Sequence, residues 1–173
     1  SVLRTGFHSL VEEETAPAVS IGPEQLPTHS WFSDAGILVS RSRPGAESAF
    51  GAAIKGGHNG ESHNHNDVGS YVVVLDGKPL LLDPGSEVYT RRTFSAKRYE
   101  SDVLNSYGHP VPVVGGTLQV KGTNARASIL ETAFSDTVDR LVMDMSSAYR
   151  VPALQSLTRT FEHDREAQTM YIE

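Results

Sequence analysis

The chain has 173 residues, a net charge of −6 and no cysteine. This length suits one domain or part of one, and it is enough to bury a core. The negative charge and the lack of a basic patch argue against nucleic acid as a partner. The absence of cysteine excludes disulfides and thiolate metal ligands, and we see no apolar run long enough for a membrane span.

Residues 1–30 mix proline, glycine and acidic residues with weak periodicity, so we interpret them as a linker or a surface-wrapping arm. Within that arm, 9–14 has the pattern of a short helical turn. The structured domain then covers 31–173, with strands expected at 37–40 and 48–54. Its last residues are those of a strand with no turn or tail after it, so we expect the chain to be a piece of a longer protein.

A β-hairpin is the clearest local prediction. Two apolar stretches, Tyr71 to Leu75 and Leu80 to Leu82, flank Asp76-Gly77, the residue pair typical of a type I′ turn. Counting back from this turn puts Asp83 opposite Ser70. The chain must bend before the hairpin for Asp83 to meet the histidines that precede it, and Gly69 is suited to that bend.

The polar run before the hairpin is the candidate site. His63 and His65 are two positions apart, and in an extended segment their imidazoles would lie on one face. Two imidazoles on one face can share a metal, or one can bind metal while the other handles a proton. Asp83 and the later His109 could complete such a site, because without cysteine a metal needs histidine and carboxylate ligands.

The rest of the chain is predicted to be strands and loops. Residues 86–110 form a long irregular stretch that contains most of the clustered basic residues, and loops of this length are usually functional or mobile. Further strands are expected at 111–114, 117–120, 126–134, 139–149, 154–161 and 168–172. With no long amphipathic helix, the fold class is all-β, an antiparallel β-sandwich.

One family pattern matches only in part. Gly57 followed by His63 and His65 fits the opening of a cupin-like metal motif. That motif needs a glutamate a few residues later, and the sequence has none there. A cupin-like metalloenzyme is therefore the weakest of the functional hypotheses.

A second pattern extends further. The segment HNHNDVGSYVVVLDGKPLLLDPGSEVYT, followed by NSYGHPVPVVGG, resembles the C-terminal β domain of the heparinase II/III-like family. The similarity covers about residues 58–116. Members of this family are polysaccharide lyases, in which an α-helical toroid precedes the β-sandwich and the active site lies in the cleft between them. The resemblance thus implies that the chain is part of a larger toroid-plus-sandwich protein.

The resemblance also implies roles for single residues. His63 corresponds to the catalytic histidine that the β domain contributes, and His65, Asp83 and His109 correspond to the ligands of a structural zinc. Tyr89 and Arg98 are candidates for binding an anionic sugar. These two also suit a packed loop tyrosine and a solvated arginine.

The leading functional hypothesis is therefore a lyase that cleaves uronic-acid-containing glycans, either heparin-like or alginate-like, by β-elimination. Its other catalytic residues would come from the toroid, so the isolated chain is expected to be inactive. Its partner would be an anionic polysaccharide or oligosaccharide, and its location the periplasm or the outside of the cell. The alternative is a non-catalytic sandwich whose same residues bind sugar or brace the fold.

Overall fold

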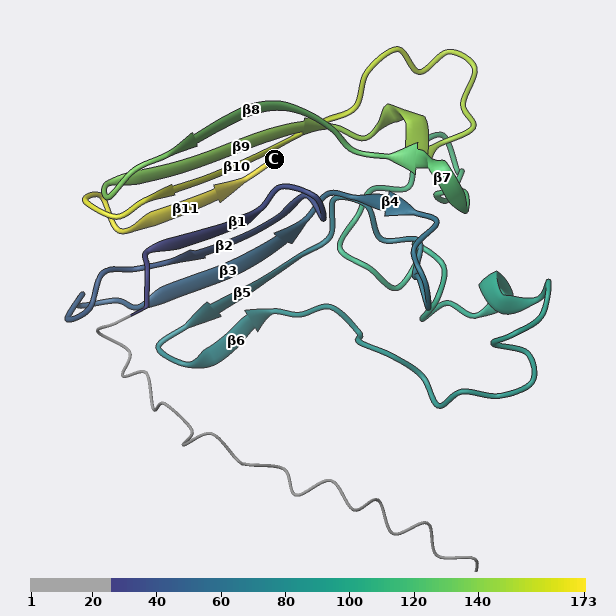
Figure 1. Cartoon of the computed structure of the whole chain (residues 1–173), viewed down its shortest axis with the longest axis horizontal. Coiled ribbons are helices and arrows are strands. Elements are labelled where there is room, and N and C mark those ends of the chain that lie inside the picture. The colour runs from purple at the N-terminus through teal and green to yellow at the C-terminus, as the bar shows by residue number, and fades with distance from the viewer. Residues whose placement is uncertain (1–25) are drawn as a thin grey trace, which may run out of the picture.

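The computed structural model describes residues 26–173, and in this part the protein has two stacked antiparallel sheets (Figure 1). The first sheet has the strand order β1-β2-β3-β5-β6. Its strands are β1 (His29–Phe32), β2 (Ile37–Arg41), β3 (Phe50–Lys55), β5 (Tyr71–Leu75) and β6 (Lys78–Leu81). The second sheet has the order β11-β10-β9-β8. Its strands are β8 (Ser128–Phe134), β9 (Val138–Asp144), β10 (Thr158–Asp164) and β11 (Thr169–Ile172).

The remaining elements are small and lie at one end of the sandwich (Figure 1). Two short strands, β4 (His58–Asn59) and β7 (Gly122–Arg126), pair with each other. The 3-10 turns are η2 (Arg98–Glu100) and η3 (Ser146–Ala148). Within residues 26–173, no helix is long and apolar enough to cross a membrane. The strands and their antiparallel pairing confirm the all-β antiparallel sandwich expected from the sequence.

The apolar core lies between the two sheets. The first sheet contributes inward residues that alternate along its strands, and the second sheet contributes a matching set. This alternation follows from the two-residue period of a strand with one buried face. The central members from the two sheets are Leu38, Ile54 and Val73 on one side and Leu141, Met143 and Phe161 on the other.

The predicted hairpin is confirmed in its turn and largely in its register. Asp76 and Gly77 both have positive φ, +52° and +73°, as a type I′ turn requires. Leu75 pairs with Lys78, and an irregularity after that shifts the register, so that Val73 pairs with Leu81.

The structure does not describe residues 1–25. Most of the predicted N-terminal arm, including the helical turn expected at 9–14, therefore lies outside the described residues.

Two of the predicted strands are absent, and three others have clearly different bounds. Residues 111–120 form only an isolated bridge between Val114 and Thr117, not the two short strands at 111–114 and 117–120. The strand expected at 154–161 begins only at Thr158, and the one expected at 126–134 is interrupted at Ala127. The strand expected at 139–149 ends at Asp144 and is followed by the turn η3. In each case the apolar pattern was present, but the backbone hydrogen bonds go to partners outside a neighbouring strand.

A buried polar cluster joins the two sheets. Arg165, next to the end of β10, donates to the carboxylate of Asp139 on β9 and to the hydroxyl of Ser40 on β2. Ser40 Oγ also donates to Asp139 Oδ2 at 2.6 Å and lies 2.9 Å from His163 Nδ1. Arg165 further donates to the backbone oxygen of Arg41 at 2.7 Å. The guanidinium therefore satisfies a buried carboxylate and also connects the two layers.

His163 is the group in this cluster that responds to pH. Burial, and then the nearby charge of Arg165, lower the pKa of His163 from 6.5 to about 4. The unfolded chain therefore binds a proton at a higher pH than the folded chain does. The stability that neutral His163 provides is complete above pH 6.5 and is lost as the pH falls toward 4.

We predict that acidification from pH 7 to pH 5 lowers the free energy of unfolding by about 2 kcal/mol through His163 alone. Urea unfolding at the two pH values measures this loss. In a His163→Gln variant the loss should shrink by that amount. An equal loss in the variant and the unaltered protein would show that His163 is not the responsible group.

Candidate functional site

The histidine-containing segment runs between β4 and β5 as a series of turns, not as a strand. The expectation that His63 and His65 share one face rested on an extended backbone and does not apply here. His63 has a left-handed φ of +58°, which is uncommon for a residue with a side chain. The bend expected at Gly69 is confirmed, since its φ is +86°. A Cβ at Gly69 would overlap the sulfur of Met145.

Gln119 holds this segment in place. Its side-chain oxygen accepts hydrogen bonds from Asn59 Nδ2 at 2.9 Å and from the backbone N–H of Val68 at 3.0 Å. Its side-chain nitrogen donates to the backbone oxygen of Val68 at 2.7 Å and to the hydroxyl of Tyr149 at 3.2 Å. The amide thus pairs with both polar groups of one backbone residue, much as a neighbouring strand would.

The backbone of Gln119 is used in the same way. Its N–H donates to Ser106 Oγ at 2.8 Å, and its oxygen accepts from Asn66 Nδ2 at 3.2 Å. Asn59 Oδ1 in turn accepts from the backbone N–H of Asp67 at 3.1 Å. These bonds fix the segment at both ends of the polar run and explain why 117–120 does not form a strand.

Three of the predicted site residues lie together. His109 Nδ1 is 2.6 Å from Asp83 Oδ2, and the rings of His65 and His109 have centroids 5.2 Å apart. Ser70 Oγ donates to Asp83 at 2.8 Å, in agreement with the predicted position of Asp83 opposite Ser70. The structure therefore brings His109 across from the long loop to the open end of the hairpin.

Burial and hydrogen bonds change the pKa values of Asp83 and His65. Burial raises the pKa of Asp83, but hydrogen bonds from His109, from the Gly85 N–H and from Ser70 outweigh it and lower the pKa to about 2. Burial, and then neighbouring His109, lower the pKa of His65. Near neutral pH, Asp83 is a carboxylate and accepts a hydrogen bond from the Nδ1–H group of His109. A neutral His109 then has its lone pair on Nε2.

The donor chemistry of this group fits a zinc ion, although the donors are not arranged as a complete site. His109 Nε2 is buried and has no hydrogen-bond partner among the described residues. A carboxylate on the other nitrogen of a histidine is the usual support for a metal-binding imidazole. However, no group of three histidine or acidic side chains in residues 26–173 is positioned to hold a metal ion. Asp83 here contacts His109 directly.

His63 lies apart from this group, on an exposed surface. Its ring stacks parallel to that of Tyr89, with centroids 5.7 Å apart, and meets the ring of Phe94 edge-on at 6.3 Å. Tyr89 and Phe94 also contact each other, at 5.5 Å. Tyr89, predicted to bind sugar, is therefore the immediate neighbour of the predicted catalytic histidine.

A pocket of about 440 Å³ opens beside His63. Its lining includes Asn64, Phe94 and Arg98, together with Glu61, Ser62 and Tyr99. Arg98 donates from Nε and Nη2 to the backbone oxygen of Asn64, at 3.1 and 2.8 Å, and from Nη1 to that of Thr93 at 2.9 Å. Arg98 thus braces the loop while its positive charge stays at the pocket.

Sequence reasoning missed Gln119, Asn64 and Phe94. Asn64 is buried, and neither atom of its side-chain amide has a hydrogen-bond partner among the described residues. Its place in the motif between His63 and His65 was a possible signal. Gln119 and Phe94 are single residues in loops, and nothing around them in the sequence marks them.

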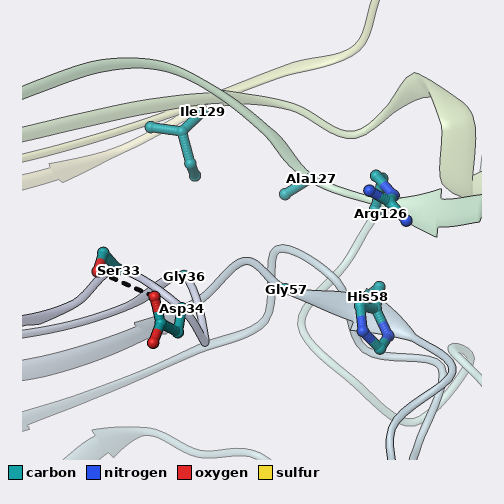
Figure 2. A pocket seen from close by; sticks show the side chains of 8 residues that line it. All are labelled: Ser33, Asp34, Gly36, Gly57, His58, Arg126, Ala127 and Ile129. Atoms are coloured by element: carbon teal, nitrogen blue, oxygen red, sulfur yellow. Dashed lines mark hydrogen bonds between the residues drawn. The ribbon is translucent and has the colours of Figure 1, made fainter. Parts of the chain in front are cut away.

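Another pocket, of about 170 Å³, lies between the two sheets near the β1–β2 turn (Figure 2). It is lined by Asp34, His58 and Arg126 with smaller neighbours, and it contains none of the predicted site residues. His58 Nδ1 accepts a hydrogen bond from the backbone N–H of Gly60 at 3.1 Å. Its ring therefore has a local structural role in β4.

Comparison with known families gives one match. The family described as "Heparinase II/III-like, C-terminal" matches residues 24–169, which is most of the chain and includes every predicted site residue. No curated protein sequence matches the chain.

We predict that Gln119→Ala lowers the free energy of unfolding by about 2–4 kcal/mol, because several buried polar groups lose their partner at once. Chemical denaturation measures the change. Gln155→Ala, which removes an exposed glutamine in a loop of the same chain, should change it by less than about 0.5 kcal/mol. Equal values for the two variants would contradict the role of Gln119.

Proposed function

The chain belongs to the heparinase II/III-like C-terminal family, and from this membership we propose that it is the β-sandwich part of a polysaccharide lyase. Its substrate would be a glycan that contains uronic acid. A helical toroid in the longer protein would supply the rest of the active site. The protein would act in the periplasm or outside the cell, where such glycans are found.

The observation that supports this proposal most is the pocket beside His63. The first histidine of the motif that the sequence shares with the family is exposed at a pocket, while the second is turned toward His109. One imidazole is therefore available to a ligand and the other to a structural contact. Such a division of roles suits a site in which the two histidines have separate tasks.

Elimination next to a uronate requires the removal of a proton from C5 of the sugar. The electron pair left behind forms the C4–C5 double bond, the bond from C4 to the glycosidic oxygen breaks, and that oxygen takes up a proton. The uronate carboxylate must be neutralised for C5 to become acidic. We propose that His63 serves here, either as the base or as the donor to the carboxylate.

Arg98 is the side chain of the pocket that favours an anionic ligand, while Glu61 in the same lining carries the opposite charge and lies 3.4 Å from the ammonium of Lys55. Although the chain has a net charge of −6, the pocket contains the guanidinium of Arg98. Three of the five N–H groups of Arg98 are used by backbone oxygens, so others remain for a carboxylate. Tyr89 would contribute by stacking on His63 and thereby limiting the orientations of the imidazole.

We predict that His63→Ala lowers lyase turnover in the full-length protein by at least about 100-fold, the usual contribution of a general acid or base. Formation of the unsaturated uronate, followed by its ultraviolet absorbance, measures this. The matched control is His58→Ala, which changes a histidine in the separate pocket of Figure 2 and should retain turnover. Normal turnover in His63→Ala would contradict the assignment.

We further propose that His65, Asp83 and His109 hold a structural zinc, with their side chains moving from the arrangement described above, in which Asp83 contacts His109 directly. Zinc would draw on the Nε2 lone pair of His109 and on the second imidazole, with the carboxylate as a ligand or as the support of His109. The bound ion would link the hairpin to the long loop through its ligands. A bound ion stabilises the folded state that binds it.

We predict about one zinc per chain by elemental mass spectrometry, and a lower melting temperature after chelation. His109→Ala should abolish both the zinc and the shift on chelation. His163→Ala, in the buried cluster between the sheets, should retain zinc. Absence of metal together with no shift would return the three residues to hydrogen bonding alone.

A further inference from the structure

Phe94 is the most unusual side chain at the pocket. It is 68% exposed, although it is large and apolar. It lies in the long loop, next to Thr93, which is almost completely buried. Water-exposed aromatic rings that border a pocket are characteristic of binding sites, because burial by a ligand is then favourable.

The backbone around Phe94 is well anchored, so the exposure is not the result of a loose loop. The backbone N–H of Thr93 donates to the oxygen of Thr90 at 3.1 Å, and its own oxygen accepts from Arg98 Nη1 at 2.9 Å. Thr93 Oγ1 accepts from the backbone N–H of Thr90 at 2.9 Å. These contacts hold Phe94 at the rim of the pocket while leaving its ring in water.

The ring of Phe94 also has a fixed relation to His63. It is perpendicular to both the His63 ring and the Tyr89 ring, with interplanar angles of 89° in each case. Edge-on contacts of this kind orient aromatic rings. The apolar ring, the imidazole and the guanidinium of Arg98 thus border a single pocket.

A pyranose matches this combination. One face of a sugar ring presents mainly C–H groups and packs on an aromatic ring, whereas its edges carry hydroxyl and carboxylate groups. The ring of Phe94 at the pocket can pack against the C–H face of the sugar. For the hydroxyl and carboxylate groups at the edges of the sugar the pocket has the guanidinium of Arg98 in its lining.

We propose that Phe94 is a substrate-binding residue that stacks against the C–H face of the uronic acid residue bound beside His63. This inference rests on the proposed function, and it adds a residue that acts by binding and not by proton transfer. Phe94 thereby sets which ring, and which face of it, is presented to the imidazole.

The test is binding by the whole chain, residues 1–173, of short uronate oligosaccharides, measured by isothermal titration calorimetry. Phe94→Ala and Phe94→Leu should each weaken binding by about tenfold, since both lose the flat ring. Phe94→Tyr should bind about as well as the unaltered protein. Phe32→Ala, which removes another exposed phenylalanine that does not line this pocket, should also bind normally.

The leucine variant separates stacking on a flat ring from general apolar contact, because it keeps an apolar side chain at the same place. Binding by Phe94→Leu at the unaltered strength would overturn the proposal, as would failure of the unaltered chain to bind any uronate oligosaccharide. Turnover by His63→Ala in the full-length protein decides the proposed function separately. Loss of turnover there, together with normal binding by Phe94→Leu, would remove the stacking role and leave the lyase assignment standing.

Discussion

The hydrogen bonds of Gln119 are the constraint on which the candidate site depends. A segment made of turns has no neighbouring strand to satisfy its backbone, and unsatisfied buried groups are costly. The amide of Gln119 supplies both a donor and an acceptor to Val68, and it also binds Asn59. A side chain thus replaces the missing strand. The polar run can therefore leave the regular sheet, with His63 turned to water and His65 turned inward.

The parts of the fold that sequence reasoning recovered are those determined by local chemistry. The Asp76-Gly77 pair specifies a turn with two positive φ angles, and Gly69 specifies a bend, because few other residues adopt these conformations. Residues 111–120 have as strong an apolar pattern as the true strands. They do not form strands because their backbone groups bond elsewhere: Gln119 to Ser106 and Asn66, Val111 to His109, and Val120 to Ala148. Such long-range side-chain partners leave no trace in a local pattern.

The candidate site shows the same difference between features set by local sequence and features set by distant contacts. The approach of Asp83 to Ser70 followed from counting along the hairpin. The approach of His109 to Asp83 depends on the path of the long loop, and the sequence indicated it only through residue type and the family resemblance. Phe94 could not be selected from the sequence, because its significance lies in its exposure at the rim of a pocket. Exposure depends on what the rest of the chain covers.

The cluster around Arg165 has a consequence for how the chain folds during synthesis. Arg165 is contacted by Ser40, 125 residues earlier in the chain, and Asp139 is contacted by the same Ser40 across 99 residues. Contacts between such distant residues form late and slow the folding of β proteins. The first sheet emerges from the ribosome well before its buried polar partners exist. Until the second sheet is made, the apolar face of the first sheet stays exposed to water, and chaperones would be most needed in that interval.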